Sequence, residues 1–468
     1  MKVNTIKDLF FSWHNEEDIR VSPLEGAGSA RNYYRVSSQK YNAIGVVGND
    51  LEENKAFIAF SKHLKKQGLP VPEIYAYALD FSCYLIEDFG DDHLFDCLIK
   101  REKATPDPLL FGYLKKALQD LSDFQILGYQ GFDFSKAYPI DEFNDQLMRW
   151  DLNYFKYSFL KPSGTGFHEQ KLENDFSTLR QSIAVINTNF FMYRDFQSRN
   201  IMIQDGELRY IDYQGAMQGP RAYDVVSLLF QARTALPAEV REELLDYFIS
   251  INRESLGEPE EQFRLGYYRI ALLRTLQVLG AYGFRGLVEH KLHFVKSIPF
   301  AMDNLRFLLT QKSLFESLPE LKRICEEISS SPQYFHRANS SQLTIHLSSF
   351  SYKKGYPADK GQNGGGFAFD CRALPNPGRL QEYKHLTGMD EPVIQYLQQY
   401  KEVDEYLEHA VAMVSKAVEN YLKRGFTDLS VAFGCTGGQH RSVYCAEKMN
   451  EALKKYPVKV NLFHREQS

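Results

Sequence analysis

Three side chains near the middle of the chain have the types and the spacing to bind a divalent metal ion and to accept a proton. Asp195 and Asn200 follow the pattern D-x-x-x-x-N, a loop length that can turn both side chains toward one metal–phosphate cluster. Residues 201–211 then read as a hairpin with an Asp205-Gly206 turn, which would return Asp212 to the same point. Phosphoryl transfer from ATP uses such a set, in which one Asp accepts the proton of the attacking hydroxyl while an Asn and a second Asp hold Mg²⁺. We therefore expect transfer of a phosphoryl group from a nucleotide to a small hydroxyl compound.

A glycine-rich segment lies upstream of this set, before the first pair of expected strands. Glycines let backbone N–H groups approach phosphates closely, and nearby hydroxyl and guanidinium groups can add donors. We expect nucleotide contacts from four residues here, Gly26, Gly28, Ser29 and Arg31. An ordinary turn is the alternative, because a G-x-G pattern alone is weak.

A second nucleotide-binding segment is expected where a strand over 83–88 ends. Glu87 and Asp88 are predicted to lie at a hinge beside the adenine. The letters Asp88-Phe89-Gly90 spell a kinase metal motif, but they precede the D-x-x-x-x-N loop. Asp212 is therefore assigned as the metal ligand.

The surrounding pattern predicts two lobes and a separate domain. Strands are expected over 32–36 and 41–47, a helix over 51–66, and helical segments from 109 to about 330. We divide the chain into a phosphotransferase domain over 1–330, with lobes of about 1–90 and 91–330, a linker over 331–342, and a domain over 343–468. Alternating strands and helices in the last segment predict an α/β domain.

Composition sets the broad class. A chain of 468 residues with 44% hydrophobic and 25% charged residues is typical of a globular protein of more than one domain. The net charge of −5 does not favour general nucleic-acid binding. The six cysteines form no C-x-x-C pair, and neither a signal peptide nor a membrane span is expected, so we predict a cytoplasmic protein.

The motifs of residues 1 to about 330 resemble those of the aminoglycoside phosphotransferase and choline kinase-like superfamily. They are most similar to the AmgK-type sugar kinases, which phosphorylate the anomeric hydroxyl of N-acetylmuramate and N-acetylglucosamine. The resemblance rests on 29–36, 69–74, 85–90, 193–200, 211–215 and 219–225. It implies an α+β bilobal protein kinase-like (APH) fold, ATP and Mg²⁺ as cofactors, Asp195 as the catalytic residue, and Asn200 and Asp212 as metal ligands. Asp224 would be a structural acid that ties the loop to the start of a helix.

Two positions depart from the pattern of that superfamily. Tyr193 stands where a His usually precedes the catalytic Asp, and Gly45 stands where a strand Lys usually holds the α- and β-phosphates. We expect Arg31 to substitute for that Lys.

The acceptor is expected to lie in the second lobe, near Asp195. A helix over 142–156 occupies the place where sugar kinases line this cleft, and a later helix carries further candidates. The expected acceptor-binding residues are Arg149, Trp150, Asp151 and Arg274, each with a packing or surface role as the alternative.

The C-terminal domain carries a second loop of interest, Phe433–Ser442, in which a strand, a Gly-rich turn and a helix start follow one another. Backbone N–H groups, the helix N-terminus and Arg441 predict an anion pocket. The same letters satisfy C-x₅-R-S, so a phosphatase with Cys435 as nucleophile is an alternative. Its general acid would be Asp370 or Asp390.

Residues 343–468 resemble the C-terminal domain of RapZ proteins, through 349–353, 369–377, 386–393 and 434–443. RapZ proteins use this domain to sense glucosamine-6-phosphate and, in some bacteria, to bind small RNAs. The resemblance outweighs the phosphatase reading and implies a phosphosugar pocket formed by Asp370, Arg372, Thr436, Gly437, His440 and Arg441.

Positive charge is lower here than in the RapZ pattern. Gly378 replaces a pocket His, and Gln439 replaces a Lys. The domain carries 16 Lys/Arg against 14 Asp/Glu, so its net charge is +2. RNA remains an alternative partner that this modest charge does not favour.

We therefore expect an ATP- and Mg²⁺-dependent kinase acting on a hydroxyl of an amino sugar of cell-wall recycling, joined to a domain that binds a phosphorylated sugar. Two alternatives stay open at this point. One is a regulatory protein that binds nucleotide and sugar phosphate with little turnover, and the other is the Cys435-dependent phosphatase.

Overall fold

The computed structural model describes residues 2–24, 31–289, 291–335, 342–357, 366–424 and 426–467. The chain divides into two compact units, one of Met1–Phe284 with Ser297–Phe335, and one of Arg285–Lys296 with His336–Ser468. Within the described residues, no helix combines the length and the apolar character needed to cross a membrane.

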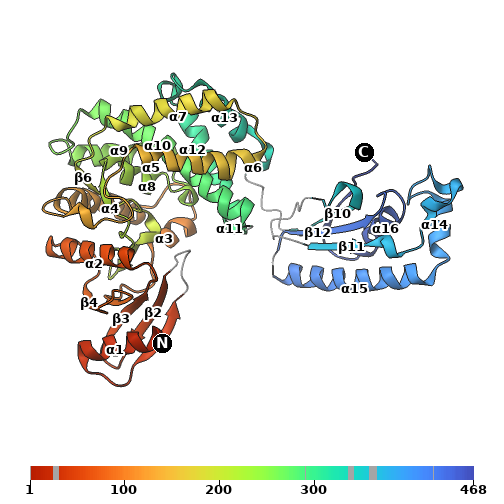
Figure 1. The fold of residues 1–468 in the computed structure, drawn as a ribbon, viewed down its shortest axis with the longest axis horizontal. Helices are drawn as coiled ribbons and strands as arrows, with labels where there is room; N and C mark the ends of the chain where they lie inside the picture. Colours follow the sequence, from red (N-terminus) through yellow and green to blue (C-terminus); the bar gives the residue numbers. More distant parts are fainter. Residues whose placement is uncertain are drawn as a thin grey trace. The chain divides into compact units, whose positions relative to one another are not determined.

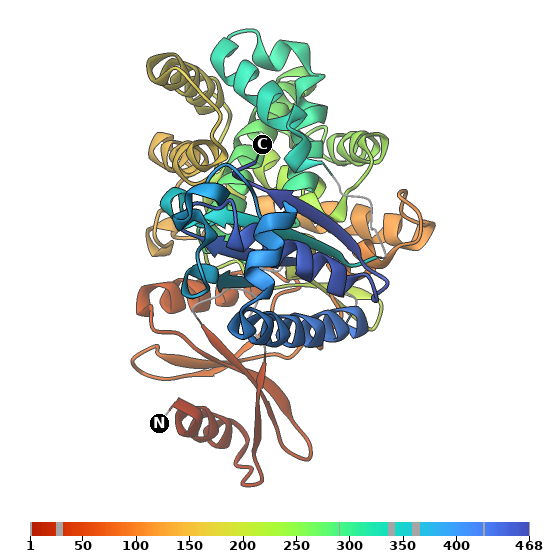
Figure 2. The ribbon, with the colours of Figure 1, turned by 90° about the vertical axis from the view of Figure 1, so that its right-hand side faces the viewer.

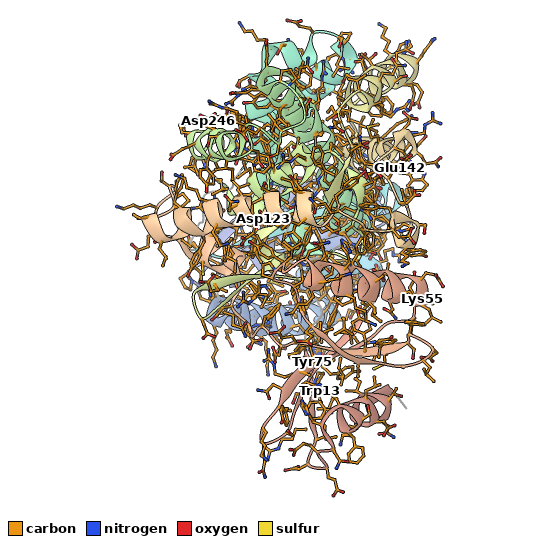
Figure 3. All side chains as sticks on the ribbon, turned by 90° about the vertical axis from the view of Figure 1, so that its left-hand side faces the viewer. Trp13, Lys55, Tyr75, Asp123, Glu142 and Asp246 are labelled. Carbon is orange, nitrogen blue, oxygen red and sulfur yellow. The ribbon has the colours of Figure 1, made fainter. Side chains whose placement is uncertain are left out.

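The first lobe of the first unit is an antiparallel sheet with one helix on each face (Figure 1). Its strands are β1 (Arg20–Leu24), β2 (Asn32–Ser37), β3 (Asn42–Val47), β4 (Ile74–Tyr77) and β5 (Cys83–Ile86), in the order β1-β2-β3-β5-β4. Helix α1 (Lys2–His14) packs Ile6 and Phe10 into the core on one face, and its Trp13 stacks on Tyr75 at 3.9 Å between ring centroids (Figure 3).

The opposite face of this sheet turns toward α2 (Leu51–Lys66). Side chains alternate between the faces of a strand, so Tyr84 of β5 points away from α1 and stacks on Phe57 of α2. Asp50 caps α2, because its carboxylate accepts a hydrogen bond from the N–H of Glu53 at 3.2 Å.

The second lobe is mostly helical and contains two small two-stranded antiparallel sheets. Its helices are α3 (Leu94–Lys100), α4 (Pro108–Leu127), α5 (Asp145–Phe155), α6 (Lys161–Ser163), α7 (Glu169–Ala184), α8 (Arg221–Leu229), α9 (Ala238–Ile251), α10 (Glu260–Tyr282), α12 (Ile298–Leu309) and α13 (Pro319–Ser330). One sheet pairs β6 (Phe190–Met192) with β9 (Met217–Gly219), and the other is the hairpin of β7 (Ile201–Gln204) and β8 (Glu207–Tyr210). They supply the segments that carry the predicted catalytic residues.

The second unit contains a parallel sheet. Strands β10 (Thr344–Ser351), β11 (Gly366–Asp370), β12 (Asp428–Cys435) and β13 (Lys459–His464) lie in the order β11-β12-β10-β13. The helices in this part are α14 (Glu391–Gln398), α15 (Lys401–Lys423) and α16 (Arg441–Leu453), while the short α11 (Leu292–Val295) belongs to the segment that groups with it. Apolar side chains of α15 and α16 form one core with β10 and β12, and α15 runs beside the strands in both views (Figures 1 and 2). The carboxyl ends of β10 and β12 lie next to each other, where open α/β sheets bind their ligands.

Candidate active site

One buried carboxylate holds the loop after β6 in place through two hydrogen bonds. Asp224, in the first turn of α8, accepts the N–H of Tyr193 at 2.7 Å and the N–H of Arg194 at 2.8 Å. Burial raises the pKa of Asp224 to about 7, and the two N–H groups oppose that shift. Arg194 has φ of 74°, a conformation that costs a non-glycine residue energy and is common at functional sites. Asp224 thus has the structural role that the sequence predicted.

Tyr193, at the position where a His is usual, has a structural role. Its side chain is buried, and its hydroxyl donates to the carbonyl of Ile211 at 2.6 Å. That bond joins the beginning of the loop to the end of the hairpin. Tyr193 therefore helps to determine where Asp212 lies.

The hairpin brings the three predicted residues together. The N–H of Ile211 donates to the carbonyl of Asn200 at 3.0 Å, so Asp212 follows directly after a residue paired with Asn200. The side-chain amide of Asn200 donates to the carbonyl of Asp195 at 2.8 Å, which turns its Oδ1 away from that carbonyl. Asp212, with φ of 71°, is half-buried and lies within electrostatic range of Asp195.

This group of oxygens fits a magnesium ion. Burial raises the pKa of Asp212, and the negative charge of Asp195 raises it further, while a hydrogen bond from Gln214 opposes the shift. Two nearby carboxylates and an amide oxygen are hard oxygen ligands, and a bound divalent cation would offset their mutual repulsion. Asn200 and Asp212 are the residues that would hold it.

A partly buried ion pair lies beside this group. Arg31, whose side chain is 3% exposed, lies 2.9 Å from the Glu53 carboxylate of α2, and the charges of both act on Asp212. A strand Lys paired with a helix Glu has the corresponding place in protein kinases. The substitution of Arg31 for that Lys stays a prediction, which the Arg31–Glu53 pair supports.

The structure gives a reason for the missing Lys. Gly45 faces α1, because a Cβ at this position would come within 2.9 Å of Ile6 Cγ2. Its neighbours Ile44 and Val46 alternate to the other face, and both are apolar. Position 45 could therefore not deliver a Lys to the cleft.

The remaining nucleotide candidates have mixed outcomes. Gly26, Gly28 and Ser29 lie outside the described residues. The carboxylate of Glu87 pairs with Lys65 at 3.1 Å, and that of Asp88 pairs with Arg35 at 2.7 Å. Because these ion pairs engage both carboxylates, contact with an adenine would fall to the backbone of this segment.

A cavity of about 500 Å³ opens beside the loop that carries Arg194 and Asp195. Its lining comes from α5, from the π-helical turn Lys156–Leu160 that follows α5, and from Arg194. Trp150 and Asp151, both expected at the acceptor site, line it.

Two other expected acceptor residues do not line this cavity. Arg149 is exposed and lies 3.9 Å from Asp145 of its own helix. Arg274 is buried behind Asp151, where it donates to the hydroxyl of Tyr223 at 2.9 Å and to Gln277. Gln277 in turn donates to Asp151 Oδ1 at 3.0 Å. Arg274 therefore supports Asp151, and Arg149 lies outside the lining of this cavity.

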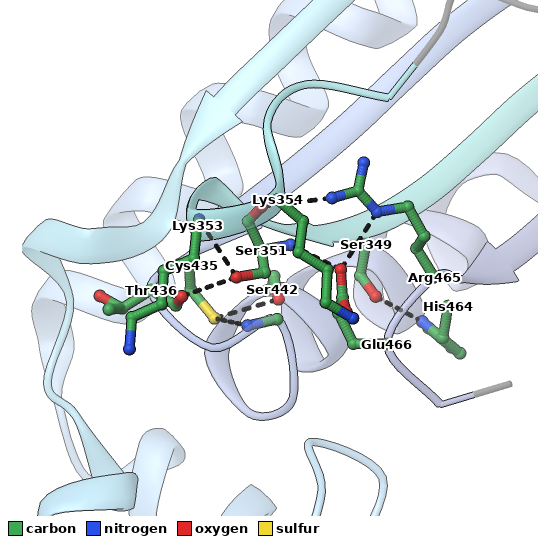
Figure 4. Close-up of polar contacts among 11 residues, drawn as sticks. Ser349, Ser351, Lys353, Lys354, Cys435, Thr436, Ser442, His464, Arg465 and Glu466 are labelled. Carbon is green, nitrogen blue, oxygen red and sulfur yellow. Dashed lines mark hydrogen bonds and ion pairs between the residues drawn. The ribbon is translucent and has the colours of Figure 1, made fainter.

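In the second unit, the Gly-rich turn closes on a cysteine (Figure 4). Cys435 Sγ accepts the N–H of Gly438 and lies within hydrogen-bonding distance of Ser442 Oγ, both at 3.2 Å. Thr436 and Gly437 are exposed at the turn, and a side chain at position 437 would meet open space. These two predicted pocket residues are accessible to a ligand.

The other predicted pocket residues are engaged within the protein. Arg372 pairs with Asp370 at 2.6 Å, and His440 Nε2 lies 2.9 Å from the carbonyl of Tyr383. Arg441 is buried and donates from Nη1 to the carbonyls of Arg372 at 2.8 Å and Leu374 at 2.9 Å. The hydrogen bonds of Arg441 argue against a C-x₅-R phosphatase, in which this guanidinium must face the phosphate.

The carboxylate of Glu466 also lies at this end of the sheet. It accepts the N–H of Ser351 at 3.4 Å and pairs with Lys354 at 2.5 Å and with Arg465 at 3.1 Å (Figure 4). These donors stabilise the negative charge of Glu466 at the carboxyl ends of β10 and β13. The hydrogen bond of Lys354 lowers the pKa of Glu466.

Comparison with known protein families agrees with this geometry. Residues 20–259 match a phosphotransferase enzyme family, the APH family. The chain belongs to this family. Residues 343–468 match the RapZ C-terminal domain. These matches confirm the expected kinase-like APH fold followed by a separate α/β domain.

The curated relatives match only a part of this chain and a part of their own length. A nucleotide-binding protein of Limosilactobacillus reuteri is 38% identical over 132 residues, which are 28% of this chain and 44% of the relative. One of Thermotoga neapolitana is 40% identical over 124 residues, 26% and 42% of the two chains. The chain thus spans less than half the length of these curated relatives.

Two solved structures resemble the chain at low sequence identity. The chain resembles an ethanolamine kinase of Plasmodium vivax at 13% identity and a TM-score of 0.44, covering 62% of this chain and 82% of that one. It resembles a choline kinase of Cryptosporidium parvum at 13% identity and a TM-score of 0.45, covering 68% and 95%.

Sequence reasoning missed several residues of the phosphotransferase unit that the geometry singles out. Glu53 pairs with Arg31, and Arg194, Tyr154 and Tyr157 line the cavity with Trp150. The cavity residues 147, 150, 151, 154, 157 and 158 recur at helical spacing. That periodicity was the available signal.

Proposed function

We propose that the chain transfers the γ-phosphoryl group of ATP to a hydroxyl of a small molecule, an amino sugar of the kind used by the AmgK-type kinases. Asp195 would accept the proton of the attacking hydroxyl. Arg31, held by Glu53, would take the phosphate-binding role of the strand Lys. Because the reaction requires ATP, we place it in the cytoplasm.

One observation supports this proposal above the others. The bond from Ile211 N–H to the Asn200 carbonyl, and the bond from the Asn200 amide to the Asp195 carbonyl, draw Asp195, Asn200 and Asp212 into one group. Bringing these charged groups together is unfavourable because it desolvates them, and such arrangements are common at functional sites. The match to a phosphotransferase family indicates which function this site would have.

Mg²⁺ would be held by Asn200 and Asp212. Bound there, the ion would supply positive charge that offsets the negative charge developing during transfer. The residues of this chain do the rest: Asp195 orients and deprotonates the acceptor, and the Tyr193 and Asp224 contacts keep its loop in place.

The test measures ADP release with ATP, Mg²⁺ and a panel of sugars, alcohols and aminoglycosides. An amino sugar should give the highest rate, and Asp195→Asn should lower it ~10²–10⁴-fold. Asp205→Asn, at the exposed tip of the neighbouring hairpin, is the matched control and should keep the rate. Absence of ADP release with every acceptor would favour a regulatory binding protein instead.

For the second unit we propose binding of a phosphorylated amino sugar at the exposed Thr436-Gly437 turn. The match to the RapZ C-terminal domain and the accessibility of this turn support it. Glucosamine-6-phosphate should raise the melting temperature of the full chain, whereas glucosamine alone should not. Equal shifts with both compounds would count against a phosphate-binding site.

A further inference from the structure

The loop from Tyr193 to Asn200 is bonded along its length to one face of helix α8. Asp224, in the first turn of that helix, accepts the N–H groups of Tyr193 and Arg194. Ser227, one turn later, donates from Oγ to the carbonyl of Arg194 at 3.4 Å. Helical residues that are three or four positions apart lie on the same face, so these contacts define the face of α8 that carries the loop.

Gln231 continues this series, four residues after Ser227 and just beyond the C-terminal end of α8. Its Oε1 accepts two hydrogen bonds from Ser198, one from the backbone N–H at 2.9 Å and one from Oγ at 2.6 Å. Both residues are buried, with Ser198 0% exposed and Gln231 8% exposed. Because an N–H group can only donate, the amide atom that Gln231 turns toward Ser198 has to be its oxygen.

The other amide atom of Gln231 shows why an acceptor is needed at this position. Its Nε2 is buried and has no hydrogen-bond partner in the part of the chain that the structure describes. A buried donor without a partner is unfavourable, and an apolar side chain of similar size would avoid it. The same apolar side chain, however, would leave the buried N–H of Ser198 without its acceptor. The contact with Ser198 therefore accounts for the Gln.

Ser198 lies between the two proposed functional residues of the loop, three residues after Asp195 and two residues before Asn200. Two short-range hydrogen bonds close the backbone around it. The N–H of Gln197 donates to the carbonyl of Asp195, and the N–H of Asn200 donates to the carbonyl of Gln197, both at 2.8 Å. The bonds from Ser198 to Gln231 leave the loop instead, and they attach its second half to the end of α8.

We propose that Gln231 is a positioning residue, which acts through Ser198 to set where Asn200 lies relative to Asp195. Asp224 holds the first half of the loop and Gln231 holds the second half, so one helix and the residues that directly follow it fix both ends. In this role Gln231 touches neither the nucleotide nor the acceptor. This inference rests on the proposed function, because it assigns the support of that same site.

Mn²⁺ binding in the presence of ADP tests this support without turnover. Electron paramagnetic resonance measures free Mn²⁺, which serves as a probe for the proposed Mg²⁺ site of the full chain. Gln231→Met removes the acceptor and should raise the Kd of Mn²⁺ ~10–100-fold, the usual effect of losing a contact that orients a metal ligand. Gln231→Glu keeps an oxygen for Ser198 and should retain most of the affinity.

Gln125→Met is the matched control for the loss of a buried amide. Gln125 is 0% exposed and its side chain bonds to Arg221, outside the loop. This variant should lower the melting temperature, as Gln231→Met should, but it should leave the Kd of Mn²⁺ unchanged. If Gln231 had only a structural role, both variants would lower the melting temperature and neither would change the Kd.

The rate of ADP release is the second measurement. At saturating Mg²⁺, Gln231→Met should lower kcat ~10–100-fold and leave the KM of the acceptor unchanged, because the loop shifts while the acceptor cavity does not. Ser198→Ala loses the hydroxyl but keeps the N–H bond, so its effect should be smaller. The double variant should be little worse than Gln231→Met alone, since the two residues act through one contact.

The outcomes separate this inference from the proposed function. Weaker Mn²⁺ binding by Gln231→Met in a chain that releases no ADP would support the positioning role and count against the kinase. ADP release with the same kcat and the same Mn²⁺ Kd in Gln231→Met and the unmodified chain would overturn the positioning role and leave the kinase intact. The role is also overturned if Gln231→Glu is as impaired as Gln231→Met, or if the unmodified chain binds no Mn²⁺.

Discussion

The guanidinium of Arg31 and the carboxylate of Glu53 form a 2.9 Å ion pair between the start of β2 and helix α2, and both charges act on Asp212. The pair joins three parts of the first unit, namely the strand end, the helix and the hairpin that carries the proposed metal ligand. Protein kinases use a strand Lys for this connection. Here the cation comes from the residue just before the strand pair.

Removing this cation should reduce turnover more than it reduces stability. We expect Arg31→Met to lower kcat/KM for ATP ~10²–10³-fold, because one preorganised charge at the phosphates is lost. Arg31→Lys should recover part of that loss. Arg20→Met, at an exposed strand position, is the control. The Arg31→Met and Glu53→Gln double variant should be little worse than Arg31→Met alone, since the two residues act as a unit. Additive losses would indicate separate roles.

Restoring a Lys at the position suggested by the motif should fail. In Gly45→Lys the new side chain would collide with Ile6 of α1, so we expect a loss of about 3 kcal/mol in the free energy of unfolding and no gain in activity. Urea denaturation measures this loss. Gly206→Lys, at an open turn, is a control only for charge, because its φ of 81° strains any side chain. Unchanged stability in Gly45→Lys would contradict the assignment of this face to α1.

The convergence of the proposed catalytic residues could be predicted from the sequence because its geometry is local. Asp195, Asn200 and Asp212 lie within one loop and one hairpin, and short-range hydrogen bonds decide where the hairpin ends. The alternation of strands and helices in 343–468 was equally readable, since each element has its own apolar period.

The facing of Gly45 and the cavity could not be predicted in the same way. A shift of one residue along a strand exchanges the two faces, and only packing against α1 decides between them. The cavity brings together Arg194 and Asp151 from different elements, and Asp151 is supported by Gln277 from a third. A spacing motif within one segment contains no information about such contacts.

Glu320 should make stability depend on pH. Hydrogen bonds from Arg323 and from the N–H of His168 lower the pKa of Glu320 to about 2. A carboxyl whose pKa is lower in the folded than in the unfolded protein stabilises the fold at pH values above its unfolded-state pKa of about 4.3. This contribution is lost as the pH falls toward 2. We expect Glu320→Gln to lower the free energy of unfolding by about 2 kcal/mol at pH 7, and by progressively less as the pH falls below about 4.5.

Glu327→Gln provides the comparison for that measurement. Glu327 pairs with the same Arg323 at 2.8 Å, but both side chains are about half exposed, so its loss should change stability by less than about 1 kcal/mol. Denaturation of the three proteins between pH 3 and 8 measures both effects. A constant difference between Glu320→Gln and the unmodified chain across this range would show that the charge of Glu320 is not the cause.

Cys435 should have a structural role in its turn and no role as a nucleophile. Its sulfur accepts the Gly438 N–H, it is 3% exposed, and Arg441 donates to the carbonyls of Arg372 and Leu374. A phosphatase cysteine must instead be accessible and face a guanidinium that holds the phosphate. We therefore expect p-nitrophenyl phosphate to be hydrolysed no faster than in buffer, by the unmodified chain and by Cys435→Ser alike. Hydrolysis that Cys435→Ser abolishes, and that Cys97→Ser in α3 leaves intact, would restore the phosphatase interpretation.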